Sequence, residues 1–139
     1  MNRVRGFEIV VDEKRKTTGE ITLPTAGTSK AMAYDFYSTD EWHAAPNAVV
    51  KVWTDVKAYM QENECLIINV RSSMGGKFML ANTSGWIDAD YYSNEGNDGN
   101  IGVFLKNILV LLYLLRLRAY PIFLQRYVLK DNPAQLYLQ

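Results

Sequence analysis

The chain has 139 residues, of which 48% are hydrophobic, and its fifteen Lys and Arg are balanced by fifteen Asp and Glu. This length predicts one domain, 1–139, with a single core, and the balanced charge argues against a nucleic-acid or membrane-surface partner. The single cysteine, Cys65, excludes an intrachain disulfide and indicates a reducing compartment, so we expect a cytoplasmic protein without a secretion signal.

Short hydrophobic runs alternate along the chain with clusters of Gly, Pro, Asn and Asp, a pattern that predicts strands joined by turns. Many short strands of this kind indicate a closed or sandwiched all-β fold. The expected strands are 6–11, 20–23, 33–37, 49–53, 56–60, 64–70, 78–81, 88–92, 101–106, 109–117 and 122–129.

The segment 49–60 is open to two interpretations. Its large apolar residues recur at helical spacing, and Pro46-Asn47 could begin a helix, so the pattern alone favours a helix. Two strands, 49–53 and 56–60, are the alternative, because local propensity is a weak guide against tertiary context.

The stretch 69–102 carries the residues with the clearest chemical meaning. An apolar strand leads into Arg71-Ser72-Ser73-Met74-Gly75. This pattern combines a guanidinium that can bind two oxygens, two hydroxyl donors and a glycine that lets the backbone approach closely. A polyphosphate needs these groups, so the sequence predicts a phosphate-binding turn here.

A second group, Asp88, Asp90 and Tyr91, follows within twenty residues. Carboxylates repel phosphates, so these residues would act through a hard cation such as Mg²⁺ or as a general base for an attacking water. Tyr91 offers a flat face for a sugar or base. Together the two groups suit a site for a nucleoside triphosphate.

Other polar or reactive residues have simpler interpretations. Cys65 lies in the apolar run ECLIINV and is expected to be an inert, buried thiol. Asp90 is interpreted as a structural carboxylate, and His43 as part of a polar turn. The Asn-rich stretch 94–100 lacks the spacing and the terminal Glu of an EF-hand, so we expect a solvated hairpin tip.

Both groups resemble motifs of one family. The two segments are similar to the second and third motifs of the trimeric dUTP pyrophosphatase (dUTPase) family, which read RSS(M/L)G and G(V/I)ID(A/S)DY. The continuation DYYSNEGNDGNIG resembles the longer form of Gram-positive bacteria and their phages. Upstream, Ala33-Tyr34-Asp35-Phe36 resembles the first motif, AGYD(L/F). The three matches occur in the family's order.

The resemblance implies a distorted jelly-roll β-barrel that forms a homotrimer, with each active site assembled from motifs of more than one subunit. It also implies hydrolysis of dUTP to dUMP and pyrophosphate by attack of water on the α-phosphorus, with Mg²⁺ on the triphosphate. For the segment 49–60 the resemblance favours two strands, although Trp53-Thr54-Asp55 stands where the family commonly has Pro-Thr-Gly.

The family's residue roles are carried over only where motifs match. Asp88 would be the base that orients and deprotonates the water. Asp35 would lie near the metal and contact it through water. Ser73 is the least certain of the phosphate ligands from sequence, since its hydroxyl could equally cap the loop. The residues expected to hold the phosphates are Arg71, Ser72, Ser73 and Gly75.

The same resemblance assigns the nucleoside end of the substrate. Tyr91 would pack on the deoxyribose, where a 2′-hydroxyl would collide with it. Asn82 and the backbone from Gly85 to Ile87 would bind the polar edge of uracil.

The chain departs from the family in three places. The loop after Gly75 is shorter. The leucine-rich run 108–121 lacks the fourth motif, GxRxxQ, for which Arg116 or Arg118 could substitute only by assumption, and the glycine-rich C-terminal fifth motif is absent. This run has about ten apolar residues before Arg116, half of a membrane span. It is either a strand buried on both faces or the product of two compensating frameshifts.

These departures keep two alternatives to an active dUTPase open. One is a catalytically impaired relative that binds dUTP or a protein partner. The other is a dCTP deaminase, which shares the fold, but that group typically continues RSS with Ala-Arg, whereas this chain has Met-Gly.

Overall fold

The computed structural model describes residues 4–109 and 122–128, and within them the only regular elements are strands and single 3₁₀ turns. The predicted all-β fold is therefore confirmed. The strands are β1 (Gly6–Ile9), β2 (Thr25–Ala26), β3 (Ala33–Phe36), β4 (Val49–Trp53), β5 (Val56–Tyr59), β6 (Glu64–Asn69), β7 (Phe78–Leu80), β8 (Gly85–Asp88), β9 (Gly102–Asn107) and β10 (Ile122–Val128). The 3₁₀ turns are η1 (Asp12–Lys14), η2 (Ser72–Met74) and η3 (Ala89–Tyr91).

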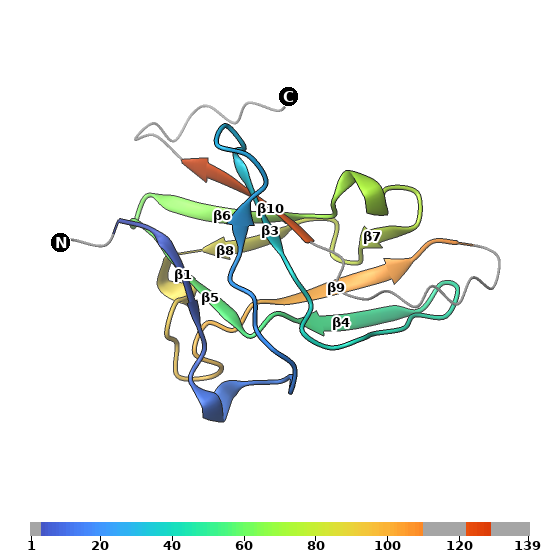
Figure 1. Cartoon of the computed structure of the whole chain (residues 1–139), viewed down its shortest axis with the longest axis horizontal. Helices are drawn as coiled ribbons and strands as arrows, with labels where there is room; N and C mark the ends of the chain where they lie inside the picture. The colour runs from blue at the N-terminus through green and yellow to red at the C-terminus, as the bar shows by residue number, and fades with distance from the viewer. Residues whose placement is uncertain (1–3, 110–121, 129–139) are drawn as a thin grey trace.

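The strands form three antiparallel sheets. A five-stranded sheet has the order β2-β3-β10-β6-β8, a three-stranded sheet has the order β4-β9-β7, and β1 pairs with β5. Figure 1 shows β6, β8 and β10 of the five-stranded sheet above β4, β5 and β9, while β7 lies level with β6 and β8 at the right. Neighbours that are distant in sequence, such as β3 with β10, make this a barrel-like arrangement rather than a series of hairpins.

The core lies between the inner faces of these sheets. Side chains alternate along β9, where Val103 and Leu105 are buried and Phe104 is exposed. Phe7 of β1 packs edge-on against Tyr34 and Phe36 of β3, which joins the small sheet to the large one. The same core anchors both segments that the sequence singled out, through β6 and β8.

The segment 49–60 forms two strands and no helix. β4 pairs with β9 and β5 pairs with β1, so cross-strand pairing outweighs the helical spacing of the apolar residues. The turn between them closes at Asp55, whose φ of 53° lies in the left-handed region that Gly usually occupies. Asp tolerates this conformation better than most residues, so the turn survives without the family's Pro and Gly.

Two predicted strands differ from the structure. Residues 20–23 are not a strand, and the pairing with β3 is made instead by Thr25 and Ala26. The strand expected at 88–92 is β8, which ends at Asp88 because Ala89–Tyr91 turns into η3. The predicted strand 109–117 lies outside the described residues apart from Leu109, which is in no strand, and the last strand is observed as β10.

The expected solvated hairpin tip at 94–100 is wrong. Asp98 is 8% exposed and accepts hydrogen bonds from Lys57 at 2.8 and 2.9 Å and from the Val11 N–H at 2.8 Å. Asn100 is fully buried and donates to Asp55 at 2.7 Å. The polar side chains of this loop therefore form internal hydrogen bonds that connect it to the N-terminal segment and to the β4–β5 turn.

These bonds set the acid sensitivity of the fold. Burial alone raises the pKa of Asp98, but the hydrogen bond from Lys57 and that from the Val11 N–H outweigh it, and the pKa lies below its ordinary value of 3.8. A carboxyl with a lowered folded-state pKa stabilises the protein above the unfolded pKa. This stability is lost as the pH falls below about 3.8 through the folded-state value.

Removing the cation of this buried pair is expected to be costly. Lys57→Met leaves the Asp98 carboxylate buried without its charge partner, so we expect the free energy of unfolding at pH 7 to fall by about 3–5 kcal/mol. Urea unfolding measures this value. The double variant Lys57→Met/Asp98→Asn removes the orphaned charge and keeps a residue that tolerates the positive φ of position 98, so most of the loss should be recovered. Equal losses in the single and double variants would contradict this account.

Candidate active site

The phosphate-binding turn predicted at 71–75 is an exposed 3₁₀ turn that Met74 anchors to the core. It follows β6, and Met74, which is 2% exposed, inserts into the core. The Met74 N–H donates to the Arg71 carbonyl at 2.8 Å and the Gly75 N–H to the Ser72 carbonyl at 3.1 Å. Ser72 and Ser73 are exposed on the resulting turn. Their hydroxyls are thus presented to solvent on a turn that is rigidly anchored.

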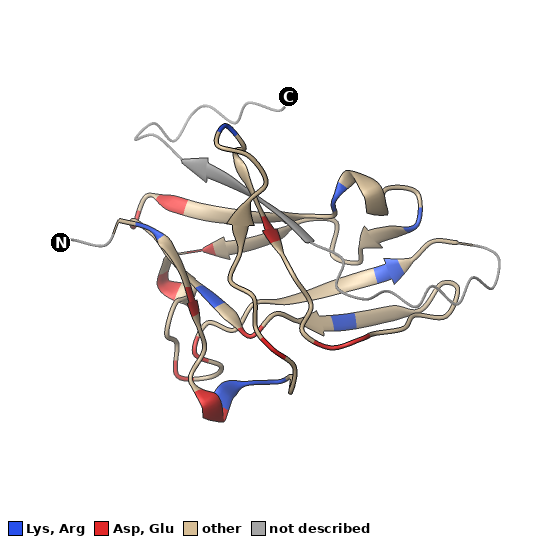
Figure 2. Ribbon diagram, in the orientation of Figure 1, with Lys and Arg blue, Asp and Glu red and all other residues tan. Residues whose placement is uncertain are grey.

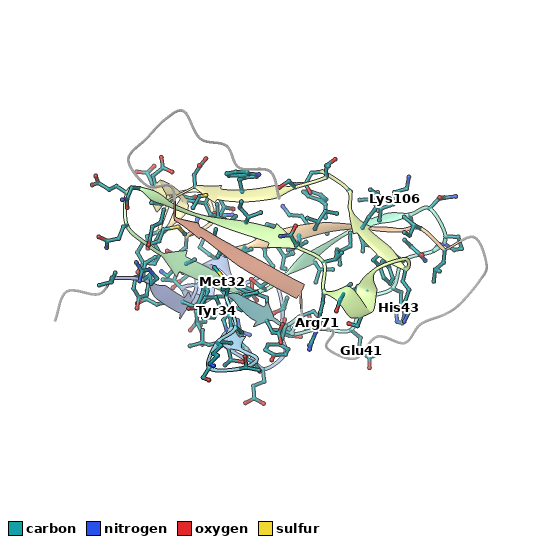
Figure 3. The ribbon with its side chains drawn as sticks, turned by 90° about the horizontal axis from the view of Figure 1, so that it is seen from above. Met32, Tyr34, Glu41, His43, Arg71 and Lys106 are labelled. Carbon is teal, nitrogen blue, oxygen red and sulfur yellow. The ribbon has the colours of Figure 1, made fainter. Side chains whose placement is uncertain are left out.

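The structure brings Asp35 of the first motif next to this turn. Arg71 Nη1 lies 3.4 Å from Asp35 Oδ2, and the Asp35 side chain is only 10% exposed while that of Arg71 is 39% exposed. Arg71 lies close to the end of the sheet at which β10 begins (Figure 3). The guanidinium is therefore oriented by a nearly buried carboxylate and still reaches solvent, where an anion can bind it.

Asp88 and Tyr91 lie together at the other end of the five-stranded sheet. Asp88 is the exposed last residue of β8, opposite Cys65 of β6, and Tyr91 ends η3. Burial and the neighbouring Asp88 charge raise the pKa of the Cys65 thiol. Cys65 is thus buried, as predicted from sequence, and a raised pKa keeps its thiol protonated and unreactive.

The predicted uracil-binding segment is the turn that leads into β8. Asn82 is exposed, and the Ser84 N–H donates to its carbonyl at 2.7 Å. Gly85 is buried against Ile68, and a side-chain carbon at position 85 would lie only 3.1 Å from the Ile68 side chain. Trp86, at a position where the motif has Val or Ile, is 52% exposed and donates to Ser84 Oγ at 2.9 Å. This turn, which connects β7 of the three-stranded sheet to β8 at the edge of the five-stranded sheet, presents backbone groups beside an exposed amide.

The two groups of candidate residues are far apart within one chain. Asp35 of β3 is opposite Phe123 of β10, which is opposite Asn69 of β6. Asp88 of β8 is opposite Cys65 of the same strand β6. Asp35 and Asp88 are therefore three strand spacings apart across the sheet, roughly 14 Å, and four residues apart along it, roughly 13 Å. A phosphate beside Asp35 is out of reach of Asp88 in the same chain.

Basic residues gather at one end of the molecule, although acidic residues are also present there. Figure 2 shows basic residues beside η2 and on β4 and β9 at the right of the view together with an acidic stretch below β4, and acidic residues at the start of β6 and the end of β8 at the left. The basic residues near the acidic end, Arg5 and Lys57, are bonded to Glu64 and Asp98. The basic segments contribute Lys51, Arg71, Lys77 and Lys106, and the acidic segments Glu62, Glu64, Asp88 and Asp90.

The donor chemistry fits a metal that arrives with the substrate. In the described part of the chain no three His, Cys, Asp or Glu side chains gather to hold a metal ion. Mg²⁺ commonly keeps several waters and takes one or two carboxylates together with phosphate oxygens. Asp35 beside a phosphate-binding turn fits that arrangement, and a dedicated protein cage does not.

Sequence reasoning missed the residues that hold Tyr91. Its hydroxyl donates to the Asn100 carbonyl at 3.1 Å and accepts from Asn97 Nδ2 at 2.7 Å, and Asn94 Nδ2 donates to its carbonyl at 2.7 Å. The signal was the run of Asn residues around Gly99 directly after the motif. Side-chain amides at this density satisfy local backbone groups as readily as they face water.

Comparison with known proteins decides the family. No family model matches the chain. The chain is 36% identical over 107 residues to the deoxyuridine 5′-triphosphate nucleotidohydrolase of Lactococcus lactis, which covers 76% of this chain and 69% of that protein. The chain belongs to the dUTPase family. The resemblance inferred from the three motifs is thereby confirmed.

Solved dUTPases share the fold. The dUTPase of Streptococcus mutans matches with a TM-score of 0.74 and 30% identity, covering 93% of this chain and 99% of that one. The dUTPase of the Staphylococcus aureus phage phi11 matches with a TM-score of 0.67 over 99% of this chain, and at 14% identity it supports the fold alone. The predicted dUTPase-like jelly roll is thus confirmed. In the described part of this chain, no helix is long and apolar enough to cross a membrane.

Proposed function

We propose that this dUTPase-family chain hydrolyses dUTP to dUMP and pyrophosphate. The observation that carries the proposal is its similarity to the Lactococcus lactis nucleotidohydrolase, together with the solvent access of the motif residues, since Asp88 is exposed and Arg71 and Tyr91 are partly exposed. Pyrophosphate release from dUTP by the purified chain tests it directly. The protein acts on free nucleotide, with neither nucleic acid nor membrane as partner, and we place it in the cytoplasm.

Arg71, the two serine hydroxyls and the backbone at Gly75 bind the triphosphate. The turn is exposed, and its guanidinium is pre-oriented by Asp35. Mg²⁺ on the phosphates would neutralise developing charge, with Asp35 contacting the ion through water. Positioning and charge neutralisation account for most of the catalysis of phosphoryl transfer.

Asp88 acts as the general base for the attacking water. Its carboxylate is exposed and sits on a fixed strand end, as a base that must reach bound water requires. Tyr91 packs on the deoxyribose and excludes a 2′-hydroxyl. Asn82 with the backbone from Gly85 to Ile87 binds uracil.

Each active site combines two copies of the chain in a homotrimer. Asp35 and Asp88 are too far apart in one chain to act on the same phosphate, so Asp88 must serve a triphosphate bound by a neighbouring copy. Because the two groups of residues lie at different places on each chain, the contacts that bring them together run head to tail and close into a ring.

Arg71→Ala is expected to weaken binding of a non-hydrolysable imido analogue of dUTP by about 10- to 100-fold, because it removes charge-assisted hydrogen bonds. Binding of dUMP should change much less. Titration calorimetry measures both ligands, and thermal unfolding reports the loss of the contact to Asp35. Lys77→Ala, which removes a neighbouring exposed positive charge, is the matched control and should have a small effect. Equal losses for the analogue and for dUMP would remove the phosphate-binding role of Arg71.

A further inference from the structure

The hydroxyl of Tyr91 is fixed by the loop that follows it. It donates to the Asn100 carbonyl at 3.1 Å and accepts from Asn97 Nδ2 at 2.7 Å, so both of its usual hydrogen-bonding roles are filled within the chain. We propose that Asn97 is a positioning residue that holds the Tyr91 ring against the sugar and thereby sets the discrimination between deoxyribose and ribose nucleotides. This inference rests on the proposed function.

The amide of Asn97 is fully used. Its Nδ2 donates to the Tyr91 hydroxyl and, at 3.2 Å, to the Asn100 carbonyl. Its Oδ1 accepts from Asn94 Nδ2 at 2.9 Å and from the Gly99 N–H at 3.1 Å. Because a backbone N–H can only donate, the orientation of the amide is determined. All four hydrogen bonds available to an Asn side chain are made, which leaves it no alternative rotamer of equal energy.

The loop that carries Asn97 is itself held in place. Gly99 has a φ of 80°, and a side-chain carbon there would lie 2.8 Å from the Tyr91 carbonyl, so only glycine lets the loop fold back onto Tyr91. Asp98 is paired with Lys57, and Asn100 is fully buried. The hydrogen bonds that join the Tyr91 hydroxyl to Asn97 and Asn100 form a tether, and this tether is anchored on the barrel and not on a free loop.

A fixed ring is what steric selection requires. A hydrogen atom and a hydroxyl at the 2′ carbon differ by one oxygen, and a ring that can tilt accommodates both. When the hydroxyl of Tyr91 is tied to Asn97 and Asn100, the ring cannot tilt without breaking hydrogen bonds. Loss of one such hydrogen bond changes an equilibrium constant by about tenfold.

The test compares four variants and one control variant for kcat/KM with dUTP and UTP, and for calorimetric binding of their non-hydrolysable imido analogues. Asn97→Ala and Tyr91→Phe each break the tether, one from either side, so each should reduce the dUTP-to-UTP preference by about tenfold, and the double variant should do no more than either single one. Asn97→Asp keeps the acceptor for Gly99 and Asn94 but replaces the Nδ2 donor to the Tyr91 hydroxyl and the Asn100 carbonyl with an acceptor, so it should reduce the preference as Asn97→Ala does. Asn47→Asp, in an exposed turn, is the control for added charge.

The outcomes separate the inference from the proposed function. If wild-type protein hydrolyses dUTP with a strong preference and Asn97→Ala lowers stability without changing the preference, Asn97 is merely structural and the inference is wrong. Additive effects of Asn97→Ala and Tyr91→Phe would also overturn it. If wild-type protein neither hydrolyses dUTP nor distinguishes the two analogues, the proposed function fails, and the inference with it.

Discussion

Asp88→Asn is expected to lower dUTP turnover by about 10³-fold or more while dUTP binding is retained. The amide is nearly isosteric with the carboxylate but cannot accept the proton of the attacking water, and general bases contribute up to about 10⁴-fold. The Asp88 side chain is exposed and makes no hydrogen bond within the described part of the chain, so the fold should survive. Steady-state kinetics with dUTP and calorimetry with the imido analogue measure the two effects.

Asp90→Asn is the matched control for this change. Asp90 is an exposed carboxylate two residues further on, in η3, and we assign it a structural role. It should keep turnover within a few-fold of wild type. If Asp88→Asn lost binding in proportion to turnover, Asp88 would be a binding or structural residue instead of the base.

Mixing two inactive variants is expected to restore activity. Arg71→Ala and Asp88→Asn should each show little turnover alone at low dUTP concentration. In a trimer assembled at random from equal amounts, about one site in four joins an intact Arg71 to the intact Asp88 of its neighbour, so about a quarter of wild-type activity should return. The physical reason is the separation of Asp35 and Asp88 along and across the five-stranded sheet.

The mixture must be made by co-refolding or co-expression, with different affinity tags on the two variants so that mixed assemblies can be isolated. Mixed assemblies that remain inactive would show that each site lies within one chain. A chain that stays monomeric while it hydrolyses dUTP would contradict the shared site in a different way.

The sequence predicted the chemistry of single motifs from residue types over a few positions. Arg71 and the hydroxyls after it were predicted to bind a polyphosphate, which stays a prediction, and the structure keeps those positions on one turn. Strands were equally visible, since β4 and β6 are short apolar runs between turn residues. The two strands at 49–60 could be chosen over a helix only with the help of the family resemblance, because their pairing partners are distant in sequence.

The sequence could not reveal how residues that are distant along the chain are placed relative to one another in the fold. Nothing in the spacing of Asp35 and Asp88 indicates that they lie at different places on one sheet, since β10 separates their strands only after the barrel has closed. The Asn-rich loop was misjudged for a related reason. Asp98 and Asn100 look like surface residues until Lys57 and Asp55, about forty residues away, are placed beside them.

The end of β8 illustrates a smaller failure of local reasoning. Asp88-Ala89-Asp90-Tyr91 alternates polar and nonpolar residues as a strand does, but the chain turns at Asp88 into η3. The turn allows the hydroxyl of Tyr91 to reach the loop that follows. A local strand pattern was therefore overridden by contacts with that loop.

Pyrophosphate release from dUTP in the presence of Mg²⁺, measured beside UTP, dCTP and the Asp88→Asn variant, tests the central claim most directly. The account predicts release that is specific to dUTP and lost in the variant. Absence of release from dUTP by folded protein, or release of ammonia from dCTP with the triphosphate intact, would contradict it.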